Sequence, residues 1–345
     1  MTGPSRRAEI GLLLGSVASF LLLAEAVIRL TGGVDPGPSG YAPVNTRRRG
    51  MAPTNSRGYR DKERTTTKPA GSRRLLSLGD SFAWGAGVEF DDTYAQRLER
   101  HLSRRRQEPW EVIQLALPGM NTVDQASQLV EAGLAYGPDV VVLGYVLNDS
   151  EDSQAAETRR EREWAEERKQ RRERGLLDRS ALYRLVSTRL WATAENRRRI
   201  AGYLSMYQED APGWQAGRKA LDRIGGLCRD HGIPVVVVVF PLFGQPLDNA
   251  YPFLEIHRKV AEAGAAAGAE VVDLLPRFAG LRFDLLVVDG AADEHPNEIA
   301  HRIAADAILG ALDDVLPAGS MASRATLSGT ARTRSPAETP AGGRQ

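Results

Sequence analysis

Short runs of residues that are apolar at almost every position constrain the fold of this chain most strongly. The clearest run is Val235–Val239, which contains only valine. A strand with one face in water alternates apolar and polar side chains, whereas a strand of a parallel sheet is covered on both faces and is apolar throughout. The runs are RRLLSLG (73–79), VIQLAL (112–117), DVVVLGYV (139–146), PVVVVVF (234–240) and EVVDLL (270–275). We therefore expect a buried parallel sheet.

Segments with the periodicity of amphipathic helices separate these runs. TYAQRLERHLSRR (93–105) and VDQASQLVEAGLAYG (123–137) both place apolar residues at intervals of three and four. Strands that alternate with helices predict a doubly wound α/β fold of three layers. In such folds the functional residues lie at the carboxyl ends of the strands, so we expect the active or binding site there.

The N-terminus carries a long apolar segment. Ile10–Leu30 is about as long as the roughly 20 residues that cross a bilayer as a helix. Its two charges, Glu25 and Arg29, stand four residues apart and can pair on one helix face. The alternative is a cleaved signal peptide, because Ala24-Glu25-Ala26 resembles a cleavage site, but the run is longer than a secretory core. We expect a retained anchor and an exported domain.

The chain divides by composition into five parts. We expect a membrane anchor over 1–31, a stalk over 32–72, a catalytic-type domain over 73–316 with a helical insertion at about 150–214, and a disordered tail over 317–345. The first half of the insertion is highly charged, as a solvated helix would be. The second half has an apolar stripe that would cover the active site, touch the membrane surface or complete the core. That stripe is Leu182, Leu185, Val186 and Leu190.

Charge and cysteine content exclude several classes of protein. Lys and Arg number 45 against 44 Asp and Glu, so no overall charge favours nucleic acid. The single cysteine, Cys228, excludes an intramolecular disulfide and a multi-cysteine metal site. We interpret Cys228 as a packed side chain of a helix.

A serine, a histidine and an acidic residue occur where strands and loops would place them for nucleophilic chemistry. Ser81 follows the first strand in LGDSFAWGAGV, and His295 stands near the C-terminus in ADEHPNEIAHRI with Asp293 two residues earlier. A nucleophilic hydroxyl needs a base, and the base needs an acceptor that fixes its tautomer. Taken singly, Ser81 also suits a helix N-cap, and His295 suits a surface position near a helix start.

Two further loops offer hydrogen-bond donors. Gly119 follows the second strand in LALPGMNT, and Asn148 follows the third in GYVLNDSED. Together with the backbone N–H of Ser81, they are donors of the kind that stabilise an oxyanion. The alternatives are a turn with positive φ at Gly119 and an Asx-turn or helix cap at Asn148.

The segments around Ser81, Gly119, Asn148 and His295 resemble, in order and approximate spacing, the four sequence blocks of the SGNH/GDSL hydrolase family. The resemblance covers roughly residues 75–312. The upstream TNSRGYRDKER is similar to the segment that precedes the domain in membrane-anchored bacterial members. The resemblance implies a flavodoxin-like α/β/α sandwich that hydrolyses esters, including O-acetyl sugars, lipids and thioesters. It implies Ser81 as nucleophile, His295 as base, and an oxyanion hole formed by Ser81, Gly119 and Asn148.

The sequence departs from the family pattern at three places. The acidic residue often lies three before the histidine, where this chain has Ala292, so we assign Asp293 and keep Asp289 as the weaker candidate. The glycine of Gly-x-Asn-Asp is Val146. The glycine often found five residues after the histidine is Ala300, and we interpret the adjacent His301 as structural.

We therefore expect an exported, membrane-anchored serine esterase acting on a small-molecule, lipid or glycan ester without a metal or cofactor. Two alternatives remain at this stage. An O-acyltransferase acting on an envelope polysaccharide would use the same three residues. A non-catalytic binding or scaffold protein would not use them. A nucleotide-binding flavodoxin-like protein is disfavoured, since no GxGxxG or GxxxxGK[ST] loop follows the first strand.

Overall fold

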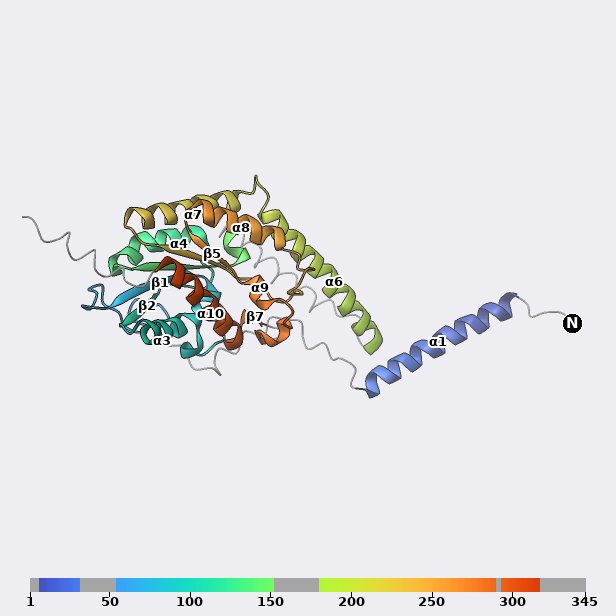
Figure 1. The fold of residues 1–345 in the computed structure, drawn as a ribbon. Helices are drawn as coiled ribbons and strands as arrows, with labels where there is room; N and C mark the ends of the chain where they lie inside the picture. Colours follow the sequence, from blue (N-terminus) through green and yellow to red (C-terminus); the bar gives the residue numbers. More distant parts are fainter. Residues whose placement is uncertain (1–5, 32–53, 152–179, 290–292, 317–345) are drawn as a thin grey trace, which may run out of the picture.

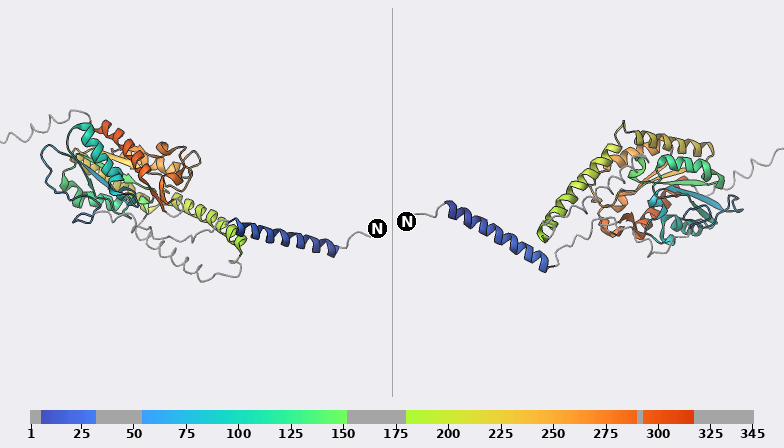
Figure 2. Two further views of the ribbon diagram at one scale, coloured as in Figure 1. Left: turned by 90° about the horizontal axis from the view of Figure 1, so that it is seen from below. Right: turned by 180° about the vertical axis from the view of Figure 1, so that it is seen from behind.

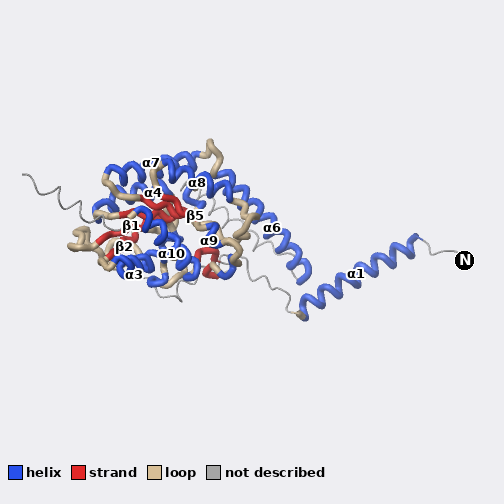
Figure 3. Tube along the Cα trace, viewed as in Figure 1, coloured by secondary structure: helices blue, strands red, loops and turns tan. Residues whose placement is uncertain are grey.

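A five-stranded parallel sheet lies at the centre of the protein. In this computed structural model the described residues are 6–31, 54–151, 180–289 and 293–316. Helices surround the strands on both sides (Figures 1 and 3). The strand order is β2-β1-β3-β4-β5, which is the doubly wound order of flavodoxin-like folds. The strands are β1 (Arg73–Gly79), β2 (Trp110–Gln114), β3 (Val140–Tyr145), β4 (Val235–Val239) and β5 (Glu270–Asp273).

The predicted strands all form, and the interior strands are buried on both faces, whereas β5 at one edge of the sheet is partly exposed. Every residue of β3 and β4 is buried. In register, Gly79 at the end of β1 pairs with Gly144 of β3, and Val239 at the end of β4 pairs with Asp273 of β5. The chain leaves β1 for β2 on one side and later returns to β3 on the other. The carboxyl ends of β1 and β3 therefore flank the crevice where such sheets bind ligands.

The helices form one layer on each face of the sheet. Helices α3 and α10 contact each other and cover one face, while α4, α7 and α8 cover the other. The longer helices are α3 (Tyr94–Arg106), α4 (Thr122–Gln128), α7 (Pro212–Asp230), α8 (Leu254–Ala266) and α10 (Glu298–Val315). The short helical elements are α2 (Ser81–Trp84), η1 (Phe90–Asp92), η2 (Leu129–Gly133), η3 (Leu134–Tyr136), η4 (Leu147–Ser150), α9 (Leu275–Phe278) and η6 (Phe283–Leu285). A two-stranded antiparallel hairpin, β6 (Val287–Asp289) and β7 (Asp293–Pro296), precedes α10.

Two long helices extend away from the sheet. Helix α1 (Arg6–Leu30) projects from the domain, and its segment Glu9–Leu30 is long and apolar enough to cross a membrane. Helix α6 (Ala181–Met206) runs from the domain toward α1 (Figures 1 and 2). The predicted pair of Glu25 and Arg29 is present, with 2.7 Å between Oε1 and Nε.

Residues 54–72, at the end of the predicted stalk, pack on the domain. Arg60 and Asp61 are buried at 4% and 2% exposure, and Asp61 accepts a hydrogen bond from the backbone of Gln114 in β2. The predicted remainder of the stalk (32–53), the charged first half of the insertion (152–179) and the predicted tail (317–345) lie outside the described residues.

Candidate functional site

The Ser81 hydroxyl stands on a sharp turn between β1 and α2. Gly79 has a φ of +152°, and a Cβ there would lie 2.5 Å from the Cβ of Ala83 and 3.0 Å from the carbonyl oxygen of Gly144. Only glycine fits this turn without strain. Asp80 then caps α2 by accepting a hydrogen bond from the N–H of Phe82 at 2.8 Å. Because Ser81 is the first residue of α2, its N–H is one of those that a helix leaves without an intrahelical partner.

The Ser81 hydroxyl, the His295 ring and the Asp293 carboxylate form a continuous chain of hydrogen bonds. Nε2 of His295 lies 2.9 Å from Oγ of Ser81, and Nδ1 of His295 lies 2.6 Å from Oδ1 of Asp293. The same Oδ1 accepts the backbone N–H of His295 at 3.0 Å. With Nδ1 donating to the carboxylate, Nε2 is left as the acceptor that can take a proton from the hydroxyl.

The hairpin β6–β7 places Asp293, and not Asp289, against the His295 ring. Asp293 and His295 lie two apart on β7, so their side chains leave the strand on the same side. Asp293 is 6% exposed, whereas Asp289, its cross-strand neighbour, is exposed. Burial favours a higher pKa for Asp293, but the hydrogen bonds from the ring and backbone of His295 outweigh burial and lower the pKa below its usual value. The carboxylate therefore stays ionised beside the imidazole.

Asn148 lies beside a pair of buried carboxylates. Its amide donates to Asp80, which is 1% exposed, and the neighbouring Asp149 is 2% exposed. Burial raises the pKa of both carboxyls, and the proximity of Asp80 raises that of Asp149 further. Asp149 is held by the Gln125 amide at 3.0 Å. Asn148 thus belongs to the hydrogen-bonded floor of the site as well as to the loop after β3.

Gly119 occupies a tight turn after β2. Its φ is +85°, and the N–H of Met120 donates to the carbonyl of Leu117 at 3.2 Å. Pro118 followed by a glycine with positive φ is the pattern of a type II turn. The prediction of a turn with positive φ at Gly119 is therefore confirmed. Because Leu117 donates to the carbonyl of Gly79 at 3.3 Å, this loop starts beside the end of β1.

Arg60 binds the C-terminal end of α2, the short helix that begins with Ser81, and sequence reasoning missed this contact. Its guanidinium donates to the carbonyls of Trp84, Gly85 and Val88, which follow Ser81, and it lies 4.8 Å from the centre of the Trp84 ring. The only signal was its place in the upstream segment TNSRGYRDKER, which says nothing of these contacts.

Three further side chains have structural roles. His301 is fully buried, and its Nδ1 accepts the N–H of Tyr94 at 3.1 Å, as the structural interpretation of His301 predicted. Phe82 packs inward, with its ring centre 5.8 Å from that of Phe240. Cys228 is fully buried in α7, and burial raises the pKa of its thiol to about 11, so it is a packing residue.

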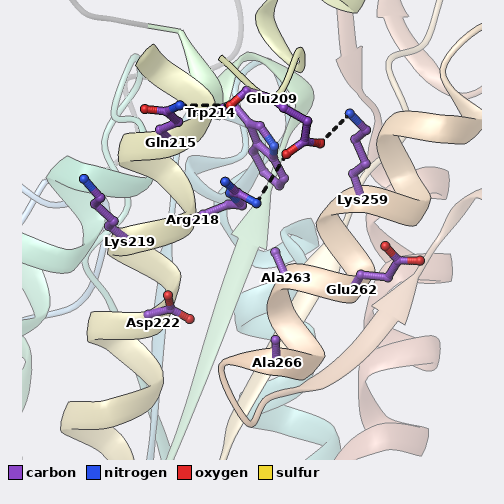
Figure 4. Close-up of a pocket in the computed structure, with 10 residues that line it drawn as sticks. All are labelled: Glu209, Trp214, Gln215, Arg218, Lys219, Asp222, Lys259, Glu262, Ala263 and Ala266. Carbon is purple, nitrogen blue, oxygen red and sulfur yellow. Dashed lines mark hydrogen bonds and ion pairs between the residues drawn. The ribbon is translucent and has the colours of Figure 1, made fainter. Parts of the chain in front are cut away.

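A separate surface hollow lies between α7 and α8 (Figure 4). Its volume is about 450 Å³, and none of the residues discussed above lines it. Glu209 pairs there with Lys259 at 2.9 Å and with Arg218 at 3.5 Å, so part of its charge is neutralised internally. Within the described parts of the chain, no group of three or more His, Cys, Asp or Glu is arranged to hold a metal ion.

Comparison with known proteins yields one family. The sequence model of the GDSL-like Lipase/Acylhydrolase family matches residues 77–303. That range contains the serine turn, both donor loops and the hairpin. No curated protein matches the sequence.

Solved structures of esterases resemble the chain at low identity. The crystal structure of TesA is 15% identical, and the match covers 71% of this chain and all of TesA with a TM-score of 0.44. The acetyl xylan esterase AlAXEase is 19% identical over 69% of this chain and 99% of its own, with a TM-score of 0.41. A two-domain esterase (CEX) active on acetylated mannans is 16% identical over 71% of this chain and 50% of its own, with a TM-score of 0.42.

Proposed function

Because the chain belongs to the GDSL-like Lipase/Acylhydrolase family and is an ester hydrolase of the SGNH type, we propose that Ser81 is its nucleophile, with His295 as base and Asp293 as the acceptor that holds the imidazole. The observation that supports this proposal most directly is the distance of 2.9 Å between Nε2 of His295 and Oγ of Ser81. That distance lies within the reach of direct proton transfer between a base and a hydroxyl.

In the proposed reaction, His295 takes the hydroxyl proton as Oγ of Ser81 attacks the acyl carbon of the ester. The imidazolium formed is stabilised by the ionised Asp293. It then protonates the departing alcohol oxygen, which leaves an acyl-enzyme. Water, deprotonated by His295, attacks the acyl carbon and releases the carboxylic acid and the free Ser81 hydroxyl.

The negative charge of each tetrahedral intermediate would be held by three donors. They are the backbone N–H groups of Ser81 and Gly119 and the side-chain amide of Asn148. The first residue of α2, the turn after β2 and the segment after β3 supply them, all following strands of one parallel sheet. Donors that are fixed before the reaction stabilise developing charge without reorganising.

We further propose that α1 anchors the protein in a membrane and that the ester hydrolase domain faces outward. No residue of the apolar window of α1 is buried inside the protein, as a lipid-facing helix requires. The substrate class we propose is a carboxylic ester, of which O-acetyl esters are the leading members.

The experiment compares p-nitrophenyl acetate turnover by the full-length chain in detergent micelles with turnover by Ser81→Ala. We expect a loss of at least about 10³-fold, because removing a nucleophile leaves only the contribution of the donors and binding. Ser127→Ala, on α4, is the matched control and should retain the parent rate. A fluorophosphonate probe should label the parent chain and not Ser81→Ala. Equal turnover by the parent and Ser81→Ala would exclude Ser81 as nucleophile.

A further inference from the structure

The long helix α6 carries an exposed apolar stripe that the ester chemistry does not use. Tyr183, Val186 and Leu190 have 42%, 47% and 67% of their surface exposed. A helix on the surface of a soluble domain normally turns its polar side outward. The outer stripe, spaced by three, four and seven residues along one face of α6, consists of Tyr183, Val186, Leu190, Ala194, Ala201 and Leu204, all exposed.

The opposite face of α6 is fixed to the domain beside the reactive residues. Arg199 pairs with Glu294 at 2.8 Å, and Glu294 stands between Asp293 and His295 in the hairpin. Asn196 exchanges a hydrogen bond of 2.6 Å with Gln245. Because these contacts hold one face of α6 inward, the outer stripe cannot turn toward the core without breaking them.

The first turn of α6 is fixed to the end of α1. The Glu25 carboxylate accepts the N–H groups of Ala181 and Leu182, both at 2.8 Å, and the hydroxyl of Ser180 at 2.9 Å. A carboxylate at a helix N-terminus satisfies its unpaired N–H groups and the positive end of its dipole. Since Glu25 lies near the C-terminal end of α1, α6 begins at the depth where α1 would leave the bilayer.

From this contact α6 diverges from the line of α1, so that the two helices form a V in Figure 1 and in the right view of Figure 2. A helix that continued α1 would carry the domain straight away from the membrane. A helix that bends at the contact can lie along the membrane surface. The apolar stripe, the fixed inner face and the start at the end of α1 all agree with the second arrangement.

We propose that α6 lies on the bilayer and that its outer stripe contacts lipid. This inference rests on the proposed membrane anchor. Interfacial helices of this kind bury their apolar face at the boundary between headgroups and acyl chains. Arg197, exposed and on the same face, can extend its guanidinium to lipid phosphates.

With α6 on the bilayer, the position of the reactive residues favours substrates that lie at the membrane surface. Because Arg199 of α6 touches the residue before His295, the reactive loop lies about one helix diameter, roughly 10 Å, from the lipid surface. An ester carried by a membrane lipid would reach Ser81 without leaving the bilayer surface. We therefore infer that the substrate class is an ester presented at the membrane, rather than a free soluble ester.

A depth measurement tests the contact. The full-length chain, reconstituted in vesicles of phosphatidylethanolamine and phosphatidylglycerol, receives a fluorophore on Leu190→Cys or, as the matched control, on Lys219→Cys, which is exposed on α7. The native Cys228 is buried and stays in place. We expect nitroxide-labelled lipids to quench the label at 190 and not the label at 219. Equal quenching by aqueous iodide at both positions would overturn the proposal. Protection of the label at 190 from iodide without quenching by the lipids would also overturn it, because it would indicate that another protein segment covers this face.

An activity measurement separates this inference from the proposed function. The variant Val186→Glu/Leu190→Glu should turn over p-nitrophenyl acetate within about two-fold of the parent, and hydrolyse p-nitrophenyl palmitate embedded in the vesicles about ten-fold more slowly. Gln215→Glu, on the exposed side of α7, should change neither rate. Equal rates of parent and double variant on the embedded ester would refute the lipid contact alone. A parent chain inactive on both esters would instead refute the proposed function.

Discussion

The ring nitrogen Nε2 of His295 lies 2.9 Å from the hydroxyl oxygen of Ser81, although 214 positions separate the two residues in the chain. The fold brings them together because Ser81 lies two residues after Gly79, the last residue of the interior strand β1, while the hairpin β6–β7 lies at the same end of the sheet and contacts α2. The hydroxyl is fixed by a glycine turn, and the ring is fixed by Asp293, so both partners are oriented before a substrate binds.

The acidic residue can be tested by exchanging each candidate for its amide. Asp293→Asn should reduce kcat for p-nitrophenyl acetate by about 10² to 10⁴-fold, because an amide no longer fixes the tautomer or stabilises the imidazolium. Asp289→Asn is the matched control, since that side chain is exposed on the neighbouring strand, and it should keep the parent rate. A larger loss in Asp289→Asn than in Asp293→Asn would reverse the assignment.

Asn148 should act on the transition state more than on substrate binding. For Asn148→Ala we expect kcat to fall by about 10²- to 10³-fold with KM changed little, as for the loss of one oxyanion donor. Combined with Ser81→Ala, the loss should be far from additive, because residues of one site act together. Because Asn148 also donates to Asp80, thermal unfolding is measured in parallel. A lowered Tm with an unchanged kcat would show that Asn148 has only a structural role, through its hydrogen bond to Asp80.

The sheet was predictable from the sequence because its interior strands are covered on both faces and are therefore apolar at almost every position. The five apolar runs coincide with β1 to β5 to within a few residues, and the run of valines is β4. The strand order does not follow from such runs, and the resemblance to a family supplied it. Ser81, Asp293 and His295 were singled out because they stand after the first strand and on one loop before the last helix, and because their segments match the order of a known family's motifs.

Contacts between distant segments could not be predicted in the same way. Arg60 donates to backbone carbonyl groups, which every residue has. The sequence therefore carries no residue type or spacing that would predict this contact. Likewise Glu25 was predicted to pair with Arg29 and does so, but its contact with the start of α6 joins residues 156 positions apart. The predicted stripe of Leu182, Leu185, Val186 and Leu190 had three possible roles. Val186 and Leu190 are exposed, which argues against packing in the core, whereas Leu182 and Leu185 are partly buried.

His301 should make the protein sensitive to acid. Burial lowers the pKa of its imidazole from 6.5 to about 3, so the folded protein keeps this ring neutral while the unfolded chain protonates it below pH 6.5. The unfolded state then binds more protons, and the free energy of unfolding falls by about 1.4 kcal/mol for each pH unit below that value. Between pH 6.5 and pH 4 the expected loss is about 3 kcal/mol.

The test is urea unfolding of the parent and of His301→Gln across that pH range. Glutamine retains an acceptor for the N–H of Tyr94 but cannot take up a proton. The stability of His301→Gln should therefore depend less steeply on pH than that of the parent. Parallel profiles would show that His301 is not the source of the acid sensitivity.

Arg60 should contribute to stability through the turn that follows Ser81. In Arg60→Met the apolar part of the side chain is kept, but the carbonyls of Gly85 and Val88 lose a buried charged donor. We expect the free energy of unfolding to fall by about 2–4 kcal/mol, as for buried groups left without their partner. The matched control is Arg104→Met, because Arg104 is exposed on α3, and its effect should stay within about 0.5 kcal/mol. Since these carbonyls follow α2, whose first residue is Ser81, kcat of Arg60→Met should also fall at temperatures where the variant is fully folded. An unchanged kcat there would limit Arg60 to a role in stability.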